Sequence, residues 1–187
     1  MNKTELRSFY KEKRSQLDEE QRAAISKSIA QNLENSFSFE GELISIFLPI
    51  SRLHEIDTSF ILEKFSLSNS FCSPVADFQN HSMEHIELNS KTVIKQNDWG
   101  IPEPSNGHAF IEKDITVVIV PLLISDLNGN RLGYGKGFYD RFLAKLDKDT
   151  SIIGINYFEP VQSLPEVNKF DIPLHYLATA DTIFKSE

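Results

Sequence analysis

The chain has almost no cysteine, no long apolar run and no excess of basic residues. Its single cysteine, Cys72, cannot form an internal disulfide, which argues against a disulfide-stabilised secreted protein and favours the cytoplasm. No segment is apolar over the length of a membrane helix, and the polar start MNKTELRSFYKEKR is unlike a secretory signal. A net charge of −8 disfavours general binding to nucleic acid. We therefore expect neither a nucleic-acid partner nor a membrane partner, and a small buried side chain at Cys72.

The hydrophobic pattern predicts an α/β fold. We expect one domain over residues 1–187, with a mostly parallel sheet between two layers of helices and an N-terminal pair of helices. The expected helices are 2–16, a second one capped by Asp18 and Gln21, 57–66 and 137–147. The expected strands are 42–48, 71–75, 85–88 at an edge, 115–124, 151–155 and a last one at 176–180, with 95–114 rich in loops. The β-branched run in 115–124 indicates a strand covered on both faces.

Residues 128–143 read NGNRLGYGKGFYDRFL and hold four of the eight glycines. Closely spaced glycines let backbone N–H groups turn toward an anion, and Arg131 and Lys136 add two fixed cations. Asp140 can hold the divalent cation that accompanies a polyphosphate. The spacing is G-x-G-x-G, because Asn130 stands where a Walker A loop needs glycine and Phe138 stands where a dinucleotide fingerprint needs it. The segment therefore predicts a phosphate-binding loop of another kind, the alternative being a flexible surface turn.

Two further groups of polar residues need an interpretation. Lys3 and Arg7 are four residues apart, so one face of the first helix presents both cations. Lys11 and Arg14 continue this stripe, and we expect both of them to be exposed. The five histidines show no zinc-site spacing and no neighbouring nucleophile, so we expect surface or loop positions for all of them: His54, His81, His85, His108 and His175.

Five separated pieces of the chain resemble the 5-formyltetrahydrofolate cyclo-ligase (methenyltetrahydrofolate synthetase) family. They are Lys3-x-x-Leu6-Arg7, ISIFLP followed by HEIDT at 54–58, WGIPEP at 99–104, residues 128–141 and FDIP at 170–173. The resemblance implies an ATP- and Mg²⁺-dependent conversion of 5-formyltetrahydrofolate, with or without a polyglutamate tail, to 5,10-methenyltetrahydrofolate. ADP and phosphate are released. It also implies a monomeric enzyme.

The resemblance carries roles over to the matching positions. Lys136 and Arg131 are the expected catalytic cations. The expected ATP-binding residues are Lys3, Arg7, Arg131, Gly133, Tyr134, Gly135, Lys136, Gly137, Phe138 and Tyr139. The expected folate-binding residues are Glu55, Met83, Trp99 and Phe138, and the expected magnesium ligands are Asp140 and Asp171. Two positions depart from the family pattern, because Phe138 stands where some members have tyrosine and Tyr134 stands where others have arginine.

Bland interpretations of these residues remain open at this point. Glu55 reads equally well as a surface acid that opens a helix, and Trp99 as a core residue under a loop. For Asp140 the alternative is an exposed charge on a helix face, whereas Asp171 taken alone is interpreted as a turn or capping residue. A non-catalytic folate- or nucleotide-binding module is the alternative function. A sugar-phosphate isomerase or CoA transferase on a related scaffold is a further one, since fold alone does not decide function.

Overall fold

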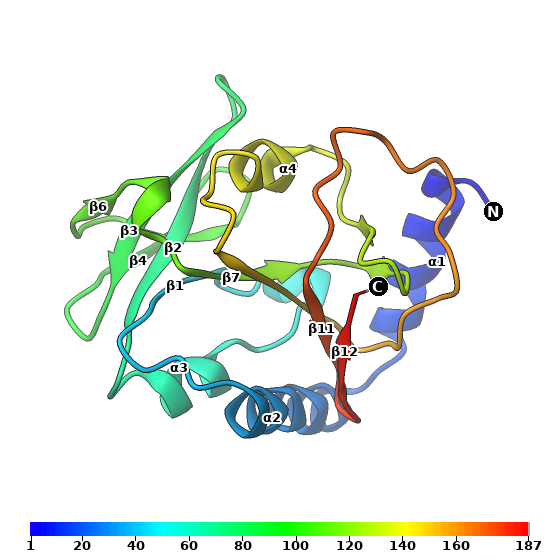
Figure 1. Ribbon diagram of the computed structural model, residues 1–187, viewed down its shortest axis with the longest axis horizontal. Helices are drawn as coiled ribbons and strands as arrows, with labels where there is room; N and C mark the ends of the chain where they lie inside the picture. Colours follow the sequence, from blue (N-terminus) through cyan, green and yellow to red (C-terminus); the bar gives the residue numbers. More distant parts are fainter. Residues whose placement is uncertain (187) are drawn as a thin grey trace.

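An eight-stranded sheet forms the middle layer of the computed structural model, which describes residues 1–186 (Figure 1). The strand order is β12-β11-β10-β7-β1-β2-β3-β6, and the five strands from β11 to β2 run parallel to one another. The antiparallel pairings lie at the two edges. The bounds are β1 Leu43–Ile46, β2 Ser70–Asp77, β3 Ser82–Leu88, β6 Ala109–Phe110, β7 Val117–Pro121, β10 Ser151–Ile155, β11 Tyr176–Ala178 and β12 Ile183–Lys185. The predicted α/β class with a mostly parallel sheet is confirmed.

Local capping rules explain where the first two helices begin. The Asn2 side chain accepts from the backbone of Thr4 and Glu5 at the start of α1 (Lys3–Ser15). Asp18 and Gln21 form the predicted reciprocal capping box of α2 (Glu19–Ser36). The shorter elements are α3 (Ser59–Phe65), α4 (Phe138–Leu143) and the 3₁₀ turns Ser51–Leu53 and Glu112–Asp114.

Helices cover both faces of the sheet. In the view of Figure 1, α2 and α3 lie below the sheet, α4 lies above it, and α1 lies at the right-hand side. Alternation along β7 serves the two layers, because Val117 and Ile119 pack with α2 and α3, whereas Val118 and Val120 pack with α4. The two N-terminal helices are consecutive, as predicted, but they pack in different places. A third cluster joins Leu6 and Tyr10 of α1 to the chain that follows β7.

Several predicted boundaries are wrong. The apolar run 115–124 is not one strand: β7 ends at Pro121, and β8 (Ile124–Ser125) pairs instead with β9 (Arg131–Leu132) in a separate hairpin. Burial hides this break, since both pieces are apolar. The segment 95–114 holds β6 and most of the hairpin of β4 (Ile94–Gln96) and β5 (Pro102–Pro104), so it is not simply loop. α4 ends at Leu143 instead of 147, and β12 follows β11, so 176–180 is not the last strand.

Single residues correct two more expectations. Arg14 is only 2% exposed, because it lies on the face of α1 that carries Leu6 and Tyr10. His85 is buried in β3 and stacks on Phe142 of α4, with ring centroids 4.1 Å apart, so it is no surface histidine. Cys72 is fully buried, as predicted. No helix within residues 1–186 is both long enough and apolar enough to cross a membrane.

Candidate active site

A cleft of about 450 Å³ opens beyond the carboxyl ends of β1 and β7, where parallel α/β sheets bind their ligands. Its walls include the segment after β1, the end of β7, the glycine loop and one face of α1. The structure brings all fifteen expected site residues to this cleft: Lys3, Arg7, Glu55, Met83, Trp99, Arg131, Gly133, Tyr134, Gly135, Lys136, Gly137, Phe138, Tyr139, Asp140 and Asp171. Segments far apart in the sequence thus form one site.

The glycine loop is held in a conformation that exposes its amides. Gly135 and Gly137 have φ angles of 86° and 69°, in the left-handed region that side chains disfavour. A Cβ atom on Gly135 would also lie 3.1 Å from the Arg7 guanidinium. Within residues 1–186, no protein acceptor pairs with the backbone N–H groups of residues 133–137. The amides of this cleft-lining loop are therefore free to donate to a ligand, as a phosphate site requires.

Cations from two elements converge on this loop. Lys3, Arg7 and Lys11 are spaced by four residues along α1 and all line the cleft. Arg7 Nε donates to the carbonyl oxygen of Gly133 at 3.0 Å, which fixes α1 to the loop. Lys136 belongs to the loop itself, is exposed and also lines the cleft. A protein of net charge −8 thus gathers positive charge in one cleft.

Arg131 lies between the two candidate metal ligands. Its Nη2 is 2.5 Å from Asp140 Oδ1, and its side chain is only 5% exposed. Asp171 Oδ2 accepts from the backbone N of Asn168 at 3.0 Å and lies 3.4 Å from Lys3 Nζ. Burial lowers the pKa of Arg131, and the charges of both aspartates oppose this shift. The three side chains form one charged group at the floor of the cleft.

The donor set fits a magnesium ion that arrives with phosphates. The second oxygen of Asp140 and of Asp171 has no hydrogen-bond partner among the described residues. No cluster of three or more His, Cys, Asp or Glu side chains in residues 1–186 is arranged to hold a metal unaided. Mg²⁺ commonly takes one or two carboxylates and completes its shell with phosphate oxygens and water. Two half-free carboxylates beside a phosphate loop match that pattern.

Glu55 is a buried acid and not the surface residue of the bland interpretation. It is 9% exposed and lines the cleft. Its Oε1 accepts from the Tyr134 hydroxyl at 2.6 Å, and its Oε2 accepts from the backbone N of Ile50 at 2.8 Å. Burial raises the pKa of Glu55, and the bond from Tyr134 is the largest of the opposing influences. The carboxylate keeps lone pairs with which it can accept further hydrogen bonds from a ligand.

Aromatic rings form the opposite wall. Trp99 is 52% exposed and stacks on Phe78 with ring centroids 4.0 Å apart, so it is not a core residue. Phe78 in turn meets Phe138 edge to face at 5.1 Å. Arg52 donates to the carbonyl oxygen of Trp99 at 2.7 Å and holds its loop. This wall is apolar, and its exposed Trp99 ring offers a face on which a planar ring can stack.

The sequence did not point to several residues of the cleft. Phe47 and Leu48 follow β1, Pro121 ends β7, and Phe78 follows β2. Their place at the carboxyl ends of expected parallel strands was a usable signal for the first three. No local pattern marks Phe78, because β2 extends beyond its expected end.

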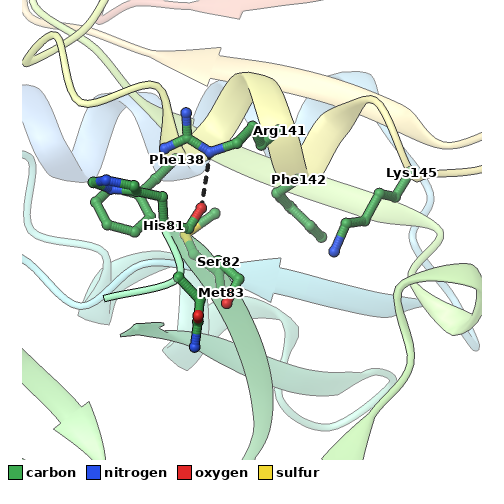
Figure 2. Close-up of a pocket in the computed structure, with 8 residues that line it drawn as sticks. His81, Ser82, Met83, Phe138, Arg141, Phe142 and Lys145 are labelled. Carbon is green, nitrogen blue, oxygen red and sulfur yellow. Dashed lines mark hydrogen bonds between the residues drawn. The ribbon is translucent and has the colours of Figure 1, made fainter. Parts of the chain in front are cut away.

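A second, smaller cavity of about 160 Å³ lies beside the main cleft (Figure 2). Met83 and Phe138 line both spaces. Arg141 Nε donates to the carbonyl oxygen of His81 across its mouth at 2.8 Å. This bond ties α4 to the turn between β2 and β3, and so supports the wall that carries Phe138.

Fold and cleft together define an α/β protein in which a glycine-rich loop with nearby cations, an aromatic wall and a buried carboxylate share one cleft. The 5-formyltetrahydrofolate cyclo-ligase family model matches residues 1–180. The chain therefore belongs to the 5-formyltetrahydrofolate cyclo-ligase family, as the sequence resemblance predicted, and it is an enzyme, a ligase of folate metabolism.

Individual relatives agree with this assignment. The chain is 29% identical over 156 residues to the 5-formyltetrahydrofolate cyclo-ligase of Haemophilus influenzae, covering 80% of this chain and 76% of the relative. It is 29% identical over 149 residues to the mouse protein of the same name, covering 75% and 72%. The structure of Aquifex aeolicus 5,10-methenyltetrahydrofolate synthetase superimposes with a TM-score of 0.82 at 28% identity, covering 99% of this chain and 93% of that one. The Mycoplasma pneumoniae synthetase shares the fold, with a TM-score of 0.77 at 22% identity over 96% of this chain and 99% of that one.

Proposed function

We propose that the protein converts 5-formyltetrahydrofolate to 5,10-methenyltetrahydrofolate at the expense of ATP and Mg²⁺, releasing ADP and phosphate. The observation that carries this proposal is the meeting of a cationic glycine loop and an aromatic wall in one cleft, with Glu55 nearby. A nucleotide phosphate needs the first surface and a flat folate ring needs the second. Family membership supports the pairing of these two ligands.

The chemistry explains why a phosphate donor is needed. The N-formyl group is a poor electrophile, and its oxygen is a poor leaving group. Transfer of the γ-phosphoryl group to the formyl oxygen gives an iminium phosphate. The folate N10 then attacks the activated carbon, its proton is lost, and the carbon–oxygen bond breaks with release of phosphate. Such a reaction depends mainly on positioning and on neutralising charge.

Residues of the loop and of α1 bind the triphosphate. The amides of residues 133–137 and the Lys136 ammonium contact phosphate oxygens, and Lys3 and Arg7 approach from the helix side. Arg131 supplies a planar guanidinium suited to phosphate oxygens. Asp140 and Asp171 would hold the Mg²⁺ that accompanies ATP, which would supply neutralisation of the phosphate charge.

The aromatic side of the cleft binds the folate. Trp99 and Phe138 contact its rings, Met83 adds an apolar contact, and Glu55 accepts hydrogen bonds from the N–H groups of the pterin. Burial raises the pKa of the Tyr139 hydroxyl, and the negative charge of Glu55 raises the pKa of Tyr139 further. A monomeric state, a cytoplasmic location and acceptance of polyglutamate tails stay predictions.

An absorbance assay tests this function. Purified protein is mixed with 5-formyltetrahydrofolate, and the near-ultraviolet absorbance of the methenyl product is followed with and without ATP and Mg²⁺. We expect product only when both are present, with one ADP released per product. Binding of both ligands without ADP release would identify a non-catalytic module. Turnover of a sugar phosphate or CoA ester without ATP would identify the other alternative.

A further inference from the structure

Arg14 is a buried cation that the cleft does not contain. It lies on the inner face of α1, is 2% exposed, and is absent from the cleft walls that Lys3, Arg7 and Lys11 form on the neighbouring face. Its Nη2 donates to the carbonyl oxygen of Leu122 at 2.5 Å. Its Nη1 donates to the hydroxyl of Tyr134 at 3.0 Å.

The contact with Tyr134 gives the hydrogen bonds a fixed direction. A guanidinium group only donates, so the Tyr134 oxygen uses a lone pair toward Arg14. The single hydroxyl proton is then left for Glu55 Oε1, 2.6 Å away. The backbone N–H of Ile50 occupies Oε2 in the same sense. Each oxygen of Glu55 therefore accepts a hydrogen bond. A hydrogen-bonded series of side chains leads from the buried Arg14 through Tyr134 to Glu55 at the cleft.

A second, indirect connection runs from Arg14 to the Glu55 backbone through Tyr157. Its guanidinium lies 5.5 Å from the centre of the Tyr157 ring, and the Tyr157 hydroxyl donates to the backbone carbonyl of Glu55 at 2.9 Å. One arginine thus supports both the side chain and the backbone of the acid. Such double support restricts the rotation of a carboxylate that would otherwise be free to turn.

A purely structural role accounts poorly for this residue. Arg14 Nε has no hydrogen-bond partner among residues 1–186, and a buried unpaired donor costs stability. Apolar residues of similar volume often replace buried charges without loss of stability. The arrangement instead benefits Glu55, because burial favours the protonated carboxyl group and a nearby donor and cation favour the carboxylate.

We propose that Arg14 is a positioning residue that, through Tyr134, holds Glu55 as a hydrogen-bond acceptor oriented toward the folate. The proposal rests on the proposed function in one respect, the placing of folate at Glu55. It also gives Tyr134 a task where some family members carry arginine, because the tyrosine relays a cation from α1 to the acid.

Separate titration of the two substrates tests the proposal. Arg14→Met keeps an unbranched apolar side chain and removes the donors and the charge, Arg14→Lys keeps the charge, and Lys13→Met is the control. Lys13 is the exposed neighbour on α1 and has no contact with Glu55. We expect Arg14→Met to raise the KM for 5-formyltetrahydrofolate about tenfold while the KM for ATP stays within twofold. Arg14→Lys should give an intermediate folate KM, and Lys13→Met should match the unchanged protein.

A second background shows whether Arg14 acts through Glu55. In a Glu55→Gln protein the carboxylate that the relay orients is replaced by a neutral amide, whose oxygen is a weaker acceptor for the Tyr134 hydroxyl. Adding Arg14→Met should then raise the folate KM less than twofold further. Tyr134→Phe removes the relay with little change of shape and should reproduce the effect of Arg14→Met, which keeps the test valid if the arginine variant does not fold. A folate KM within twofold of normal in Tyr134→Phe, or an undiminished tenfold effect of Arg14→Met in the Glu55→Gln background, would overturn the proposal.

Binding measured without turnover separates this proposal from the proposed function. Trp99 is the only tryptophan of the chain and lies in the wall of the cleft, so its fluorescence reports folate binding directly. If the unchanged protein binds 5-formyltetrahydrofolate but converts none, the proposed function fails. The Arg14 proposal is then still decided by the dissociation constants, with the same tenfold rise expected for Arg14→Met. Equal constants for the two proteins would overturn it.

Discussion

Replacing Lys136 with alanine separates catalysis from folding. The side chain is exposed, and within residues 1–186 it takes part in no salt bridge or hydrogen bond. Exposed substitutions without such contacts change the free energy of unfolding by no more than about 0.5 kcal/mol. The folded structure of Lys136→Ala should therefore match that of the unchanged protein, and its unfolding midpoint in urea should be almost the same.

The loss of activity should be much larger. Removing one well-placed donor from a site where charge develops costs about 3–4 kcal/mol, which is a factor of about 10² to 10³ in kcat. We expect the lower end of this range, because Lys3, Arg7 and Arg131 remain at the same cleft and share the work of neutralising the phosphates. The KM for ATP should rise more than the KM for folate, since the ammonium is assigned to the phosphate side.

The assay follows product absorbance and ADP release together. Lys148→Ala is the matched control, because it removes the same charge from another exposed lysine. Lys148 does not line the cleft. The control should retain normal turnover. Turnover of Lys136→Ala within threefold of the control would refute the assignment of this lysine to the phosphates. A large loss of urea stability would refute the structural part of the reasoning.

Three further changes test other parts of the molecule. Burial raises the pKa of Glu55 above 4.5, so the folded state holds this proton more tightly than the unfolded chain does. The free energy of unfolding of the unchanged protein therefore falls as pH rises from 4.5 through the raised pKa. Glu55→Gln cannot titrate, so its free energy of unfolding should increase relative to that of the unchanged protein over that interval. Asp140→Asn should need several-fold more Mg²⁺ for half-maximal rate, and an unchanged Mg²⁺ dependence would contradict the assignment of Asp140 to the metal site. Its free energy of unfolding should fall by about 1–3 kcal/mol, because the nearly buried Arg131 loses a carboxylate partner. Gly154→Ala should cost about 1–3 kcal/mol in urea unfolding, since the added Cβ would lie 2.5 Å from the fully buried Leu174 side chain, and an unchanged midpoint would show that this strand can yield.

Features governed by neighbouring residues were predictable from the sequence. The capping box of Asp18 and Gln21 depends on three residues' spacing, and it forms as expected. The glycine loop was recognisable because its composition alone limits what the backbone can do. The parallel sheet followed from the continuous β-branched run of β7. In each case the physical cause lies within a few residues of the effect.

Features that depend on distant partners were not predictable in the same way. Glu55 reads as a surface acid until Ile50 and Tyr134 surround it, and Tyr134 is 79 positions away in the sequence. The break after Pro121 was hidden because a strand of the main sheet and a strand of the β8–β9 hairpin are both apolar. Hydrophobicity reports that a segment is buried, but not which sheet it joins.

Arg14 shows where a finer reading of one helix would have succeeded. Two series with a spacing of four run along α1: Lys3, Arg7, Lys11 and Leu6, Tyr10, Arg14. The structure sends the first series to the cleft and the second to the interior. Grouping residues by charge placed Arg14 with the exposed lysines, whereas grouping by helical face places it with Leu6 and Tyr10. An arginine in register with an apolar stripe needs buried acceptors, and the structure supplies them as the Leu122 carbonyl oxygen and the Tyr134 hydroxyl.

The same contacts change the meaning of tyrosine at position 134. Judged by sequence alone, tyrosine in place of arginine removes a phosphate cation from the loop. The structure places its hydroxyl between Glu55 and the Arg14 guanidinium, with a hydrogen bond to each. The positive charge that some family members place at position 134 of the loop is therefore supplied here by Arg14 of α1. It acts on Glu55 through the Tyr134 hydroxyl. Returning arginine to position 134 would place a second guanidinium beside Arg14 at the partly buried wall of the cleft, where the two like charges repel each other. We expect Tyr134→Arg to be less stable than the unchanged protein, and Tyr134→Arg combined with Arg14→Met to recover stability, because the pair of positions has room for one cation only.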